Sequence, residues 1–221
     1  MDERTEKILK LLREEFPEPK SELKFGSVYQ LAVAVILSAQ CTDKRVNSVT
    51  PELFGRAGTP EAMVSLGEEA IAEIIKPCGF YKTKAKHIYE TSRVIVEKYG
   101  GNIPEDFEAL ESLPGIGRKT ANVITAVGFG KPAIAVDTHV FRVSGRLGLS
   151  SAKDVFGTEM QLREKISPEL WADAHHLILL HGRYVCKALN PDCGNCVLRG
   201  ICPSCGKIIK NKKSTKGKTN E

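Results

Sequence analysis

A glycine-rich turn between two helices is the part of this sequence best suited to hold a phosphate. Residues 109–130, ALESLPGIGRKTANVITAVGFG, predict a short helix, a tight turn and a second helix. Glycines let the backbone adopt positive φ, so that successive N–H groups at the second helix can point at one phosphate oxygen. Such a helix-hairpin-helix grips a DNA backbone without reading its sequence. We expect DNA contacts from Pro114, Gly115, Ile116, Gly117 and Arg118.

Two nucleotide-binding motifs do not fit this turn. A nucleotide-binding P-loop requires glycine directly before Lys-Thr, where Arg118 stands, and a dinucleotide motif requires a third glycine where Thr120 stands. A plain structural turn remains possible. However, Arg118 and Lys119 lie at the positive end of their helix, where the dipole disfavours each cation by about 0.3–1 kcal/mol. Their placement favours an anion or a reaction nearby.

Two residues could carry covalent chemistry. Most lysines are solvated surface charges, but a helix N-terminus and removal from water would favour the neutral amine of Lys119, which could attack a sugar carbon and form a Schiff base. Asp137 stands between an apolar run and a helix in PAIAVDTHVFRVSGRLG, residues 132–148. The residues alone favour an N-cap role for Asp137. Its alternative role is to take a proton from the lysine and to stabilise positive charge on a sugar ring.

Four cysteines are concentrated in CKALNPDCGNCVLRGIC, residues 186–202, with the spacing C-x6-C-x2-C-x5-C. Four thiolates can bind tetrahedral zinc or a [4Fe–4S] cluster, and the spacing does not decide between them. Disulfides are a lesser alternative, because we expect a reducing cytosol. The candidate metal ligands are Cys186, Cys193, Cys196 and Cys202. We expect Cys41 and Cys78 to be small buried or turn residues, and Cys205 to be a thiol of the tail.

The apolar runs of the sequence exclude a membrane-spanning protein, and the net charge says little about whether the folded part binds nucleic acid. The longest apolar run, LAVAVIL at residues 31–37, is far too short to cross a bilayer, and the N-terminus does not resemble a signal peptide. Residues 203–221 hold six lysines and one glutamate, which accounts for the whole net charge of +5. We expect residues 207–221 to form a disordered basic tail, which either adds attraction to phosphates or only aids solubility.

The rest of the chain shows helical signals and no sustained strand alternation, so the expected fold class is all-α. Ser27 followed by Gln30 predicts a capping box, and Thr59-Pro60-Glu61 predicts another helix start. Leu113 and Ile116 are placed to pin the hairpin helices together. Helices are expected near residues 3–15, 28–39, 43–54, 68–76, 82–98, 105–112, 118–128, 138–146, 154–165 and 168–181, with a further helix that starts at Pro60.

Several segments together resemble those of the endonuclease III family, whose members are base-excision DNA glycosylases of the helix-hairpin-helix type. They are LPGIGRKTANV, AVDTHVFRV, HGRYVC and the four-cysteine spacing, and the likeness runs in order from about residue 5 to 202. It implies a six-helix domain at residues 22–131 and a second domain from residues 1–21 and 132–206, with DNA in a cleft between them. It also implies that the four cysteines hold a [4Fe–4S] cluster.

The resemblance further implies roles for individual residues. Lys119 becomes the nucleophile and Asp137 its carboxylate partner, while Gln40 fills the space left by an extruded nucleotide. Phe80 stands where the family usually has an aliphatic wedge, a departure that leaves the opposite-base preference open. Lys187 is the only basic residue between Cys186 and Cys193, where the family is often more basic, so weaker phosphate contact is expected there.

The resulting hypothesis is a bifunctional glycosylase and abasic-site lyase that removes oxidised pyrimidines, such as thymine glycol, from damaged double-stranded DNA. We expect a cytoplasmic, nucleoid-associated monomer with no membrane partner. One alternative is a mismatch glycosylase that removes thymine or adenine, although purely hydrolytic relatives tend to lack the lysine. A second is a non-enzymatic iron–sulfur protein that binds DNA or senses redox state, and a third is a zinc-stabilised variant. A protein that only binds DNA or senses redox state would not need both Lys119 and Asp137.

Overall fold

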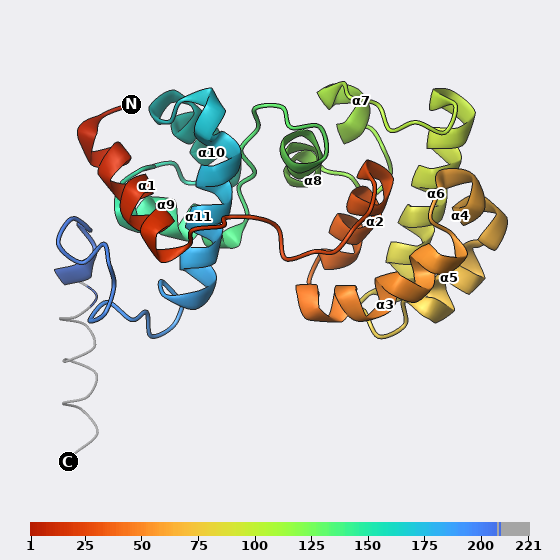
Figure 1. The fold of residues 1–221 in the computed structure, drawn as a ribbon, viewed down its shortest axis with the longest axis horizontal. Helices are drawn as coiled ribbons and strands as arrows, with labels where there is room; N and C mark the ends of the chain where they lie inside the picture. Colours follow the sequence, from red (N-terminus) through yellow and green to blue (C-terminus); the bar gives the residue numbers. More distant parts are fainter. Residues whose placement is uncertain (207, 209–221) are drawn as a thin grey trace, which may run out of the picture. The chain divides into compact units, whose positions relative to one another are not determined.

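Helices account for the regular secondary structure of the described chain (Figure 1). The computed structural model describes residues 1–206 and 208, and these contain no β-strand, which confirms the all-α prediction. The expected basic tail, residues 207–221, lies outside the described residues apart from Ile208. Within the described part, no helix is both long and apolar enough to span a membrane.

The α-helices are α1 Glu3–Glu15, α2 Val28–Ser38, α3 Asp43–Arg56, α4 Pro60–Leu66, α5 Glu68–Ile74, α6 Tyr81–Tyr99, α7 Phe107–Glu111, α8 Arg118–Val123, α9 Thr138–Leu147, α10 Val155–Lys165 and α11 Trp171–Tyr184. Two further segments are a π-helix η1, Ile124–Gly128, and a 3₁₀-helix η2, Pro168–Leu170. The single helix expected at residues 118–128 is therefore α8 followed by η1. In η1 the N–H of Phe129 donates to Ile124 O, five residues back, at 3.2 Å.

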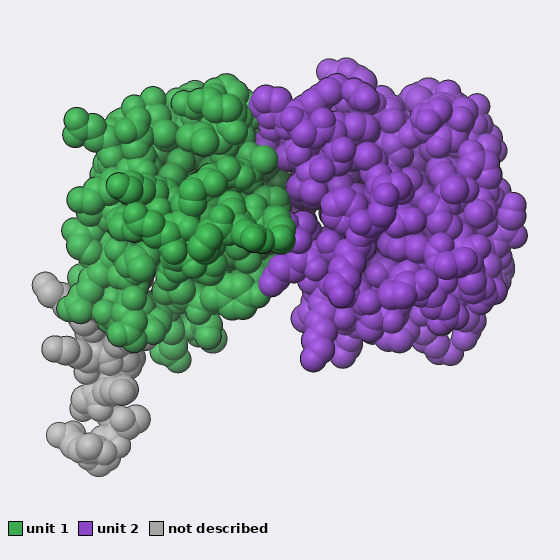
Figure 2. Space-filling view, in the orientation of Figure 1, with its two compact units in different colours: residues 1–20, 134–221 green, residues 21–133 purple. Residues whose placement is uncertain are grey.

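The chain divides into two compact units (Figure 2). Unit 1 is made of residues 1–20 and 134–221, and unit 2 of residues 21–133. Helix α1 thus belongs to the same unit as α9, α10 and α11, although more than a hundred residues separate them in the sequence.

Helix α2 supplies the centre of the core of unit 2. Its residues 31–37 are all buried, as expected for a helix that is apolar on every face. Ser27 Oγ accepts a hydrogen bond from Gln30 N–H at 3.1 Å, so Ser27 is the predicted N-cap. The side chain of Gln30 does not complete a capping box, because its Oε1 accepts from Gly26 N–H at 2.8 Å. The capping-box prediction was therefore right only for the serine.

Helices α1, α9 and α11 build the core of unit 1. The buried apolar side chains include Ile8 and Leu12 from α1, Val140 and Val143 from α9, and Leu177 and Ile178 from α11. Asp137, the N-cap of α9, follows a buried segment at residues 133–136. Burial on both sides of Asp137, in this segment and at Val140, therefore fixes the position of its carboxylate in the chain.

Candidate functional site

The predicted hairpin turn is present in unit 2, between α7 and α8. The N–H of Ile116 donates to Leu113 O at 3.0 Å and closes the turn. Proline at the second position and φ of +74° at Gly115 are the features of a type II turn. Leu113 and Ile116 are both 2 % exposed and belong to the core of unit 2, which confirms that they pin the hairpin.

Glycine is required at position 115 for two reasons: the backbone has a positive φ, and His87 of α6 lies too close to leave room for a side chain. A Cβ at this position would lie 2.8 Å from the Cβ of His87 on α6. The hydroxyl of Thr91, one turn further along α6, donates to Pro114 O. Helix α6 therefore supports the hairpin from behind and fixes the turn that precedes Arg118 and Lys119.

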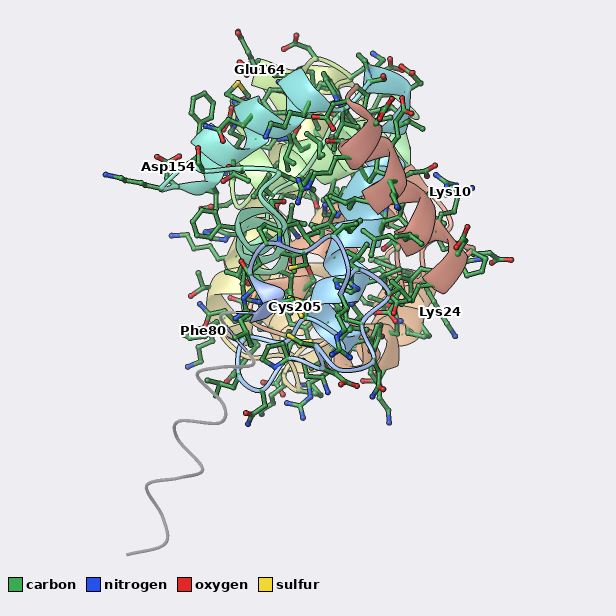
Figure 3. All side chains as sticks on the ribbon, turned by 90° about the vertical axis from the view of Figure 1, so that its left-hand side faces the viewer. Lys10, Lys24, Phe80, Asp154, Glu164 and Cys205 are labelled. Carbon is green, nitrogen blue, oxygen red and sulfur yellow. The ribbon has the colours of Figure 1, made fainter. Side chains whose placement is uncertain are left out.

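A hollow in unit 2 brings together three segments that are far apart in the sequence. It has about 630 Å³ of space, partly open to solvent, and its lining includes Gln40, Phe80, Lys84, His87, Gly115 and Thr120. Gln40 and Phe80 both have left-handed backbones, with φ of 51° and 56°. Phe80, labelled in Figure 3, is 67 % exposed, which is unusual for a large aromatic side chain. Two predicted DNA-inserting residues thus border the same hollow as the hairpin.

Lys84 is a functional candidate that was not predicted from the sequence. Its side chain is buried, and its Nζ donates to Leu37 O, near the C-terminus of α2, at 2.7 Å. Burial lowers the pKa of Lys84, and the nearby Cys41 and Cys78 thiols oppose this shift. The Lys84 ammonium therefore links the first turn of α6 to the last turn of α2. Phe80 directly precedes α6, and Gln40 lies two residues after α2. A lysine in an amphipathic helix gives no local sign of such a contact.

The two candidate catalytic residues occupy different units. Lys119 is half-buried in the first turn of α8 in unit 2, and Asp137 is half-buried in unit 1. Arg118, beside Lys119, places its guanidinium over the Phe107 ring, 5.3 Å from the centroid, a cation–π arrangement.

Asp137 is the N-cap of α9, as the residues favoured. Its Oδ1 accepts hydrogen bonds from the N–H groups of His139 and Val140, each at 2.8 Å. Because both cap bonds use Oδ1, the cap does not require Oδ2. The carboxylate can therefore be held by its helix and still present an oxygen for proton transfer.

The four cysteines of the loop line one hollow in unit 1, with about 350 Å³ of space, part of it open to solvent. The lining includes Cys186, Cys193, Cys196 and Cys202. Among the described residues, no three Cys, His, Asp or Glu side chains are arranged around a single metal ion. Four thiols that line one hollow are the number of ligands that a [4Fe–4S] cluster takes.

Side chains from outside the loop hold this hollow in place. Arg146 of α9 donates to Cys186 Sγ at 3.4 Å and to Lys187 O at 2.7 Å, and Arg142 donates to Gly182 O at 2.9 Å. Neither arginine was predicted to take part in the site. The sequence did offer one indication: Arg142 and Arg146 are four residues apart, which places both side chains on one face of the helix.

A buried histidine joins α1 to the cysteine loop. His181 Nδ1 lies 2.9 Å from Glu15 Oε2, and its Nε2 lies 3.7 Å from Cys196 Sγ. Burial lowers the pKa of His181, while the hydrogen bond to Glu15 opposes that shift. Burial also raises the pKa of the Cys196 thiol to about 11. Cluster binding must therefore displace the Cys196 proton, since a coordinating thiol is deprotonated.

The remaining predicted DNA contact is on the outer surface of the loop. Lys187 is exposed, as are its neighbours Leu189 and Asn190. Leu189 is 84 % exposed and Asn190 has a left-handed φ of 51°.

Comparison with known proteins places these features in a family. Residues 33–168 match the HhH-GPD superfamily of base excision DNA repair proteins, and residues 186–202 match the iron–sulfur binding domain of endonuclease III. The chain is 47 % identical to endonuclease III of Escherichia coli strain K12 over 195 residues, 88 % of this chain and 92 % of the relative. It is 48 % identical to endonuclease III of Bacillus subtilis strain 168 over 188 residues, 85 % and 86 % of the two chains.

The chain is also similar in structure to a solved endonuclease III complex. A trapped endonuclease III–DNA covalent intermediate, described as an estranged-adenine complex, matches with a TM-score of 0.89 at 40 % identity. The match covers 95 % of this chain and 100 % of the other.

Gly115→Ala tests whether the turn needs glycine. Alanine would adopt a strained φ and its Cβ would meet His87, so we expect the free energy of unfolding to fall by about 1–3 kcal/mol. Gly117→Ala is the matched control, since a Cβ there meets nothing within 4 Å and φ is −89°. Urea unfolding measures both. Equal stability of the two variants would contradict this account of the turn.

Lys84→Met tests the link between α2 and α6. It leaves Leu37 O unpaired, and a buried unpaired carbonyl costs about 1–3 kcal/mol. We expect lower stability in urea and faster amide hydrogen exchange at residues 39–41, which include Gln40. Lys86→Met, at an exposed position of α6, serves as the control. If exchange at residues 39–41 were the same in both variants, Lys84 would not hold this loop.

Proposed function

The chain belongs to the endonuclease III family within the HhH-GPD superfamily of base excision DNA repair proteins, and we propose on that basis which residues carry out its reaction. The protein is a bifunctional DNA glycosylase and lyase that acts on damaged double-stranded DNA and carries a [4Fe–4S] cluster. The observation that supports the residue assignments best is that one superfamily match, residues 33–168, spans the formed hairpin, Lys119 and Asp137.

The proposed substrates are oxidised pyrimidines such as thymine glycol. The damaged nucleotide leaves the base stack, because its reacting sugar carbon is inaccessible within the duplex. The proposed role of Gln40 is to fill the vacated space, and that of Phe80 is to act as a wedge against the opposite strand. The support for both roles is the shared hollow, the left-handed backbones and the exposed aromatic ring of Phe80.

The proposed nucleophile is the neutral amine of Lys119. It attacks C1′, the bond from C1′ to the base breaks, and the base leaves with a proton. Opening of the sugar ring then gives an imine between Lys119 and C1′. Loss of a proton from C2′ expels the 3′ phosphate, and water hydrolyses the imine to release the nicked strand and restore the amine.

Asp137 is the proposed acid–base partner in this sequence of steps. Its carboxylate accepts the proton that the Lys119 amine loses and stabilises positive charge on the sugar. The cap bonds from His139 and Val140 orient the carboxylate before substrate binds. We propose that the hairpin residues 114–118 and Lys187 contact DNA phosphates.

The cluster-binding loop has a structural role in this proposal. When bound, the cluster fixes the backbone of residues 186–202, which is too short to fold around a core of its own. Cys186, Cys193, Cys196 and Cys202 would hold it, and Arg146 and His181 would orient two of these thiolates. We also propose that the protein works in the cytoplasm on nucleoid DNA, and that unit 1 acts as the cluster domain. Unit 2 is the proposed counterpart of the expected six-helix domain, although its residues 21–133 contain the seven α-helices α2–α8.

Lys119→Ala and Lys119→Gln test the nucleophile. Borohydride should trap wild-type protein on a duplex that contains thymine glycol, and neither variant should form the adduct, although both should still bind DNA. An abasic duplex, an undamaged duplex and a mismatched duplex are run alongside. Trapping of Lys119→Ala would refute the assignment. Trapping on the abasic duplex alone would mean that oxidised pyrimidines are not the substrate.

Asp137→Asn separates catalysis from helix capping. The amide oxygen can still accept the two cap bonds, so stability in urea should stay within about 0.5 kcal/mol of wild type. Base excision under single-turnover conditions should slow by about 10²- to 10⁴-fold, because the proton acceptor is lost. Asp137→Ala should lose the cap as well, at about 0.5–2 kcal/mol. If Asp137→Asn excised the base at the wild-type rate, Asp137 would serve only as the N-cap of α9.

A further inference from the structure

The hollow that holds the cluster ligands contains a fifth thiol. Cys205 was expected to belong to the tail, but it is 6 % exposed and lines the same hollow as the four ligands (Cys205 is labelled in Figure 3). The expectation was wrong because the chain turns back after Cys202. The N–H of Cys205 donates to Cys202 O at 3.3 Å, so the turn that follows the last ligand carries Cys205 inward.

Cys205 has a specific neighbour among the four ligands. Its thiol donates to Cys193 O at 3.9 Å, so the Cys205 sulfur lies against the backbone of this ligand. Cys196 contacts His181 through its sulfur instead, and Cys186 contacts Arg146. Cys205 is therefore placed beside Cys193 in the way that His181 is placed beside Cys196, but its side chain ends in a sulfur that can itself bind iron.

We propose that Cys205 is a reserve cluster ligand that takes the place of Cys193 when the Cys193 thiolate is lost. In this exchange the bond between iron and the Cys193 sulfur breaks, the Cys205 thiol gives its proton to solvent, and its sulfur lone pair binds the same iron. No electron is transferred, so the step needs no oxidant or reductant. The exchange requires only that the 202–205 turn bring its thiol into the space beside Cys193.

The test compares single and double alanine variants, because alanine cannot bind iron. Full-length Cys193→Ala, Cys196→Ala, Cys205→Ala and Cys193→Ala/Cys205→Ala proteins are purified anaerobically. Iron, acid-labile sulfide and visible absorbance are then measured per protein. Cys193→Ala should keep most of its iron, whereas Cys196→Ala and the double variant should lose theirs. If Cys193→Ala held no more iron than Cys196→Ala, or if the double variant kept its iron, the proposal would be overturned.

A second measurement uses proteins whose four ligands are intact. Wild type and Cys205→Ala are exposed anaerobically to a ferrous chelator, and loss of visible absorbance is followed with time. Removal of the reserve thiol should speed loss of the cluster several-fold. Equal rates would count against the proposal even if Cys193→Ala proved insoluble. Cys78→Ala, which alters a buried thiol in unit 2, controls for the general effect of removing a cysteine.

Discussion

The burial of residues 31–37 of α2 constrains the side of unit 2 that carries the hairpin. A helix buried in this way can fill a core, but a buried carbonyl in its last turn then needs a partner from the protein. Lys84 provides one, by donating to Leu37 O. The chain then leaves the helix through the left-handed Gln40, and α6 begins after the left-handed Phe80. The need to satisfy one helix end therefore places both residues beside the hairpin.

The cysteine loop of unit 1 is too short to form an apolar core from its own residues, so it depends on contacts with the helices around it. The loop packs Leu198 and Ile201 on the core of unit 1. Polar contacts add to this packing, because Arg142 and Arg146 of α9 donate to backbone carbonyls at and before the loop, and His181 of α11 reaches Cys196. These contacts position the ligands, while the cluster supplies the bonds that close the loop. The cysteine loop is thus held by apolar packing and polar contacts together, and the cluster would add bonds to its thiolates.

Features that depend on local order were predictable from the sequence. The hairpin turn, the Ser27 and Asp137 caps and the grouping of four cysteines each arise within about twenty neighbouring residues. The missed features join distant segments: Lys84 with Leu37, His181 with Glu15, and Arg146 with the cysteine loop. A charged residue in a helix has the same local pattern whether it faces solvent or a buried carbonyl. Cys205 was misassigned for the same reason, since its burial follows from a turn and not from its neighbours' composition.

The assignment of α1 to unit 1 has a consequence for synthesis on the ribosome. Residues 21–133 contain every segment of unit 2, so that unit can fold while the rest of the chain is still being made. Helix α1 precedes unit 2 in the sequence but needs α9 and α11, which follow unit 2, before Ile8 and Leu12 have a core to enter. Its apolar face therefore stays without its native partners until α11 has been made. Helix α1 is thus made before unit 2 but reaches its native contacts only after unit 2 is complete.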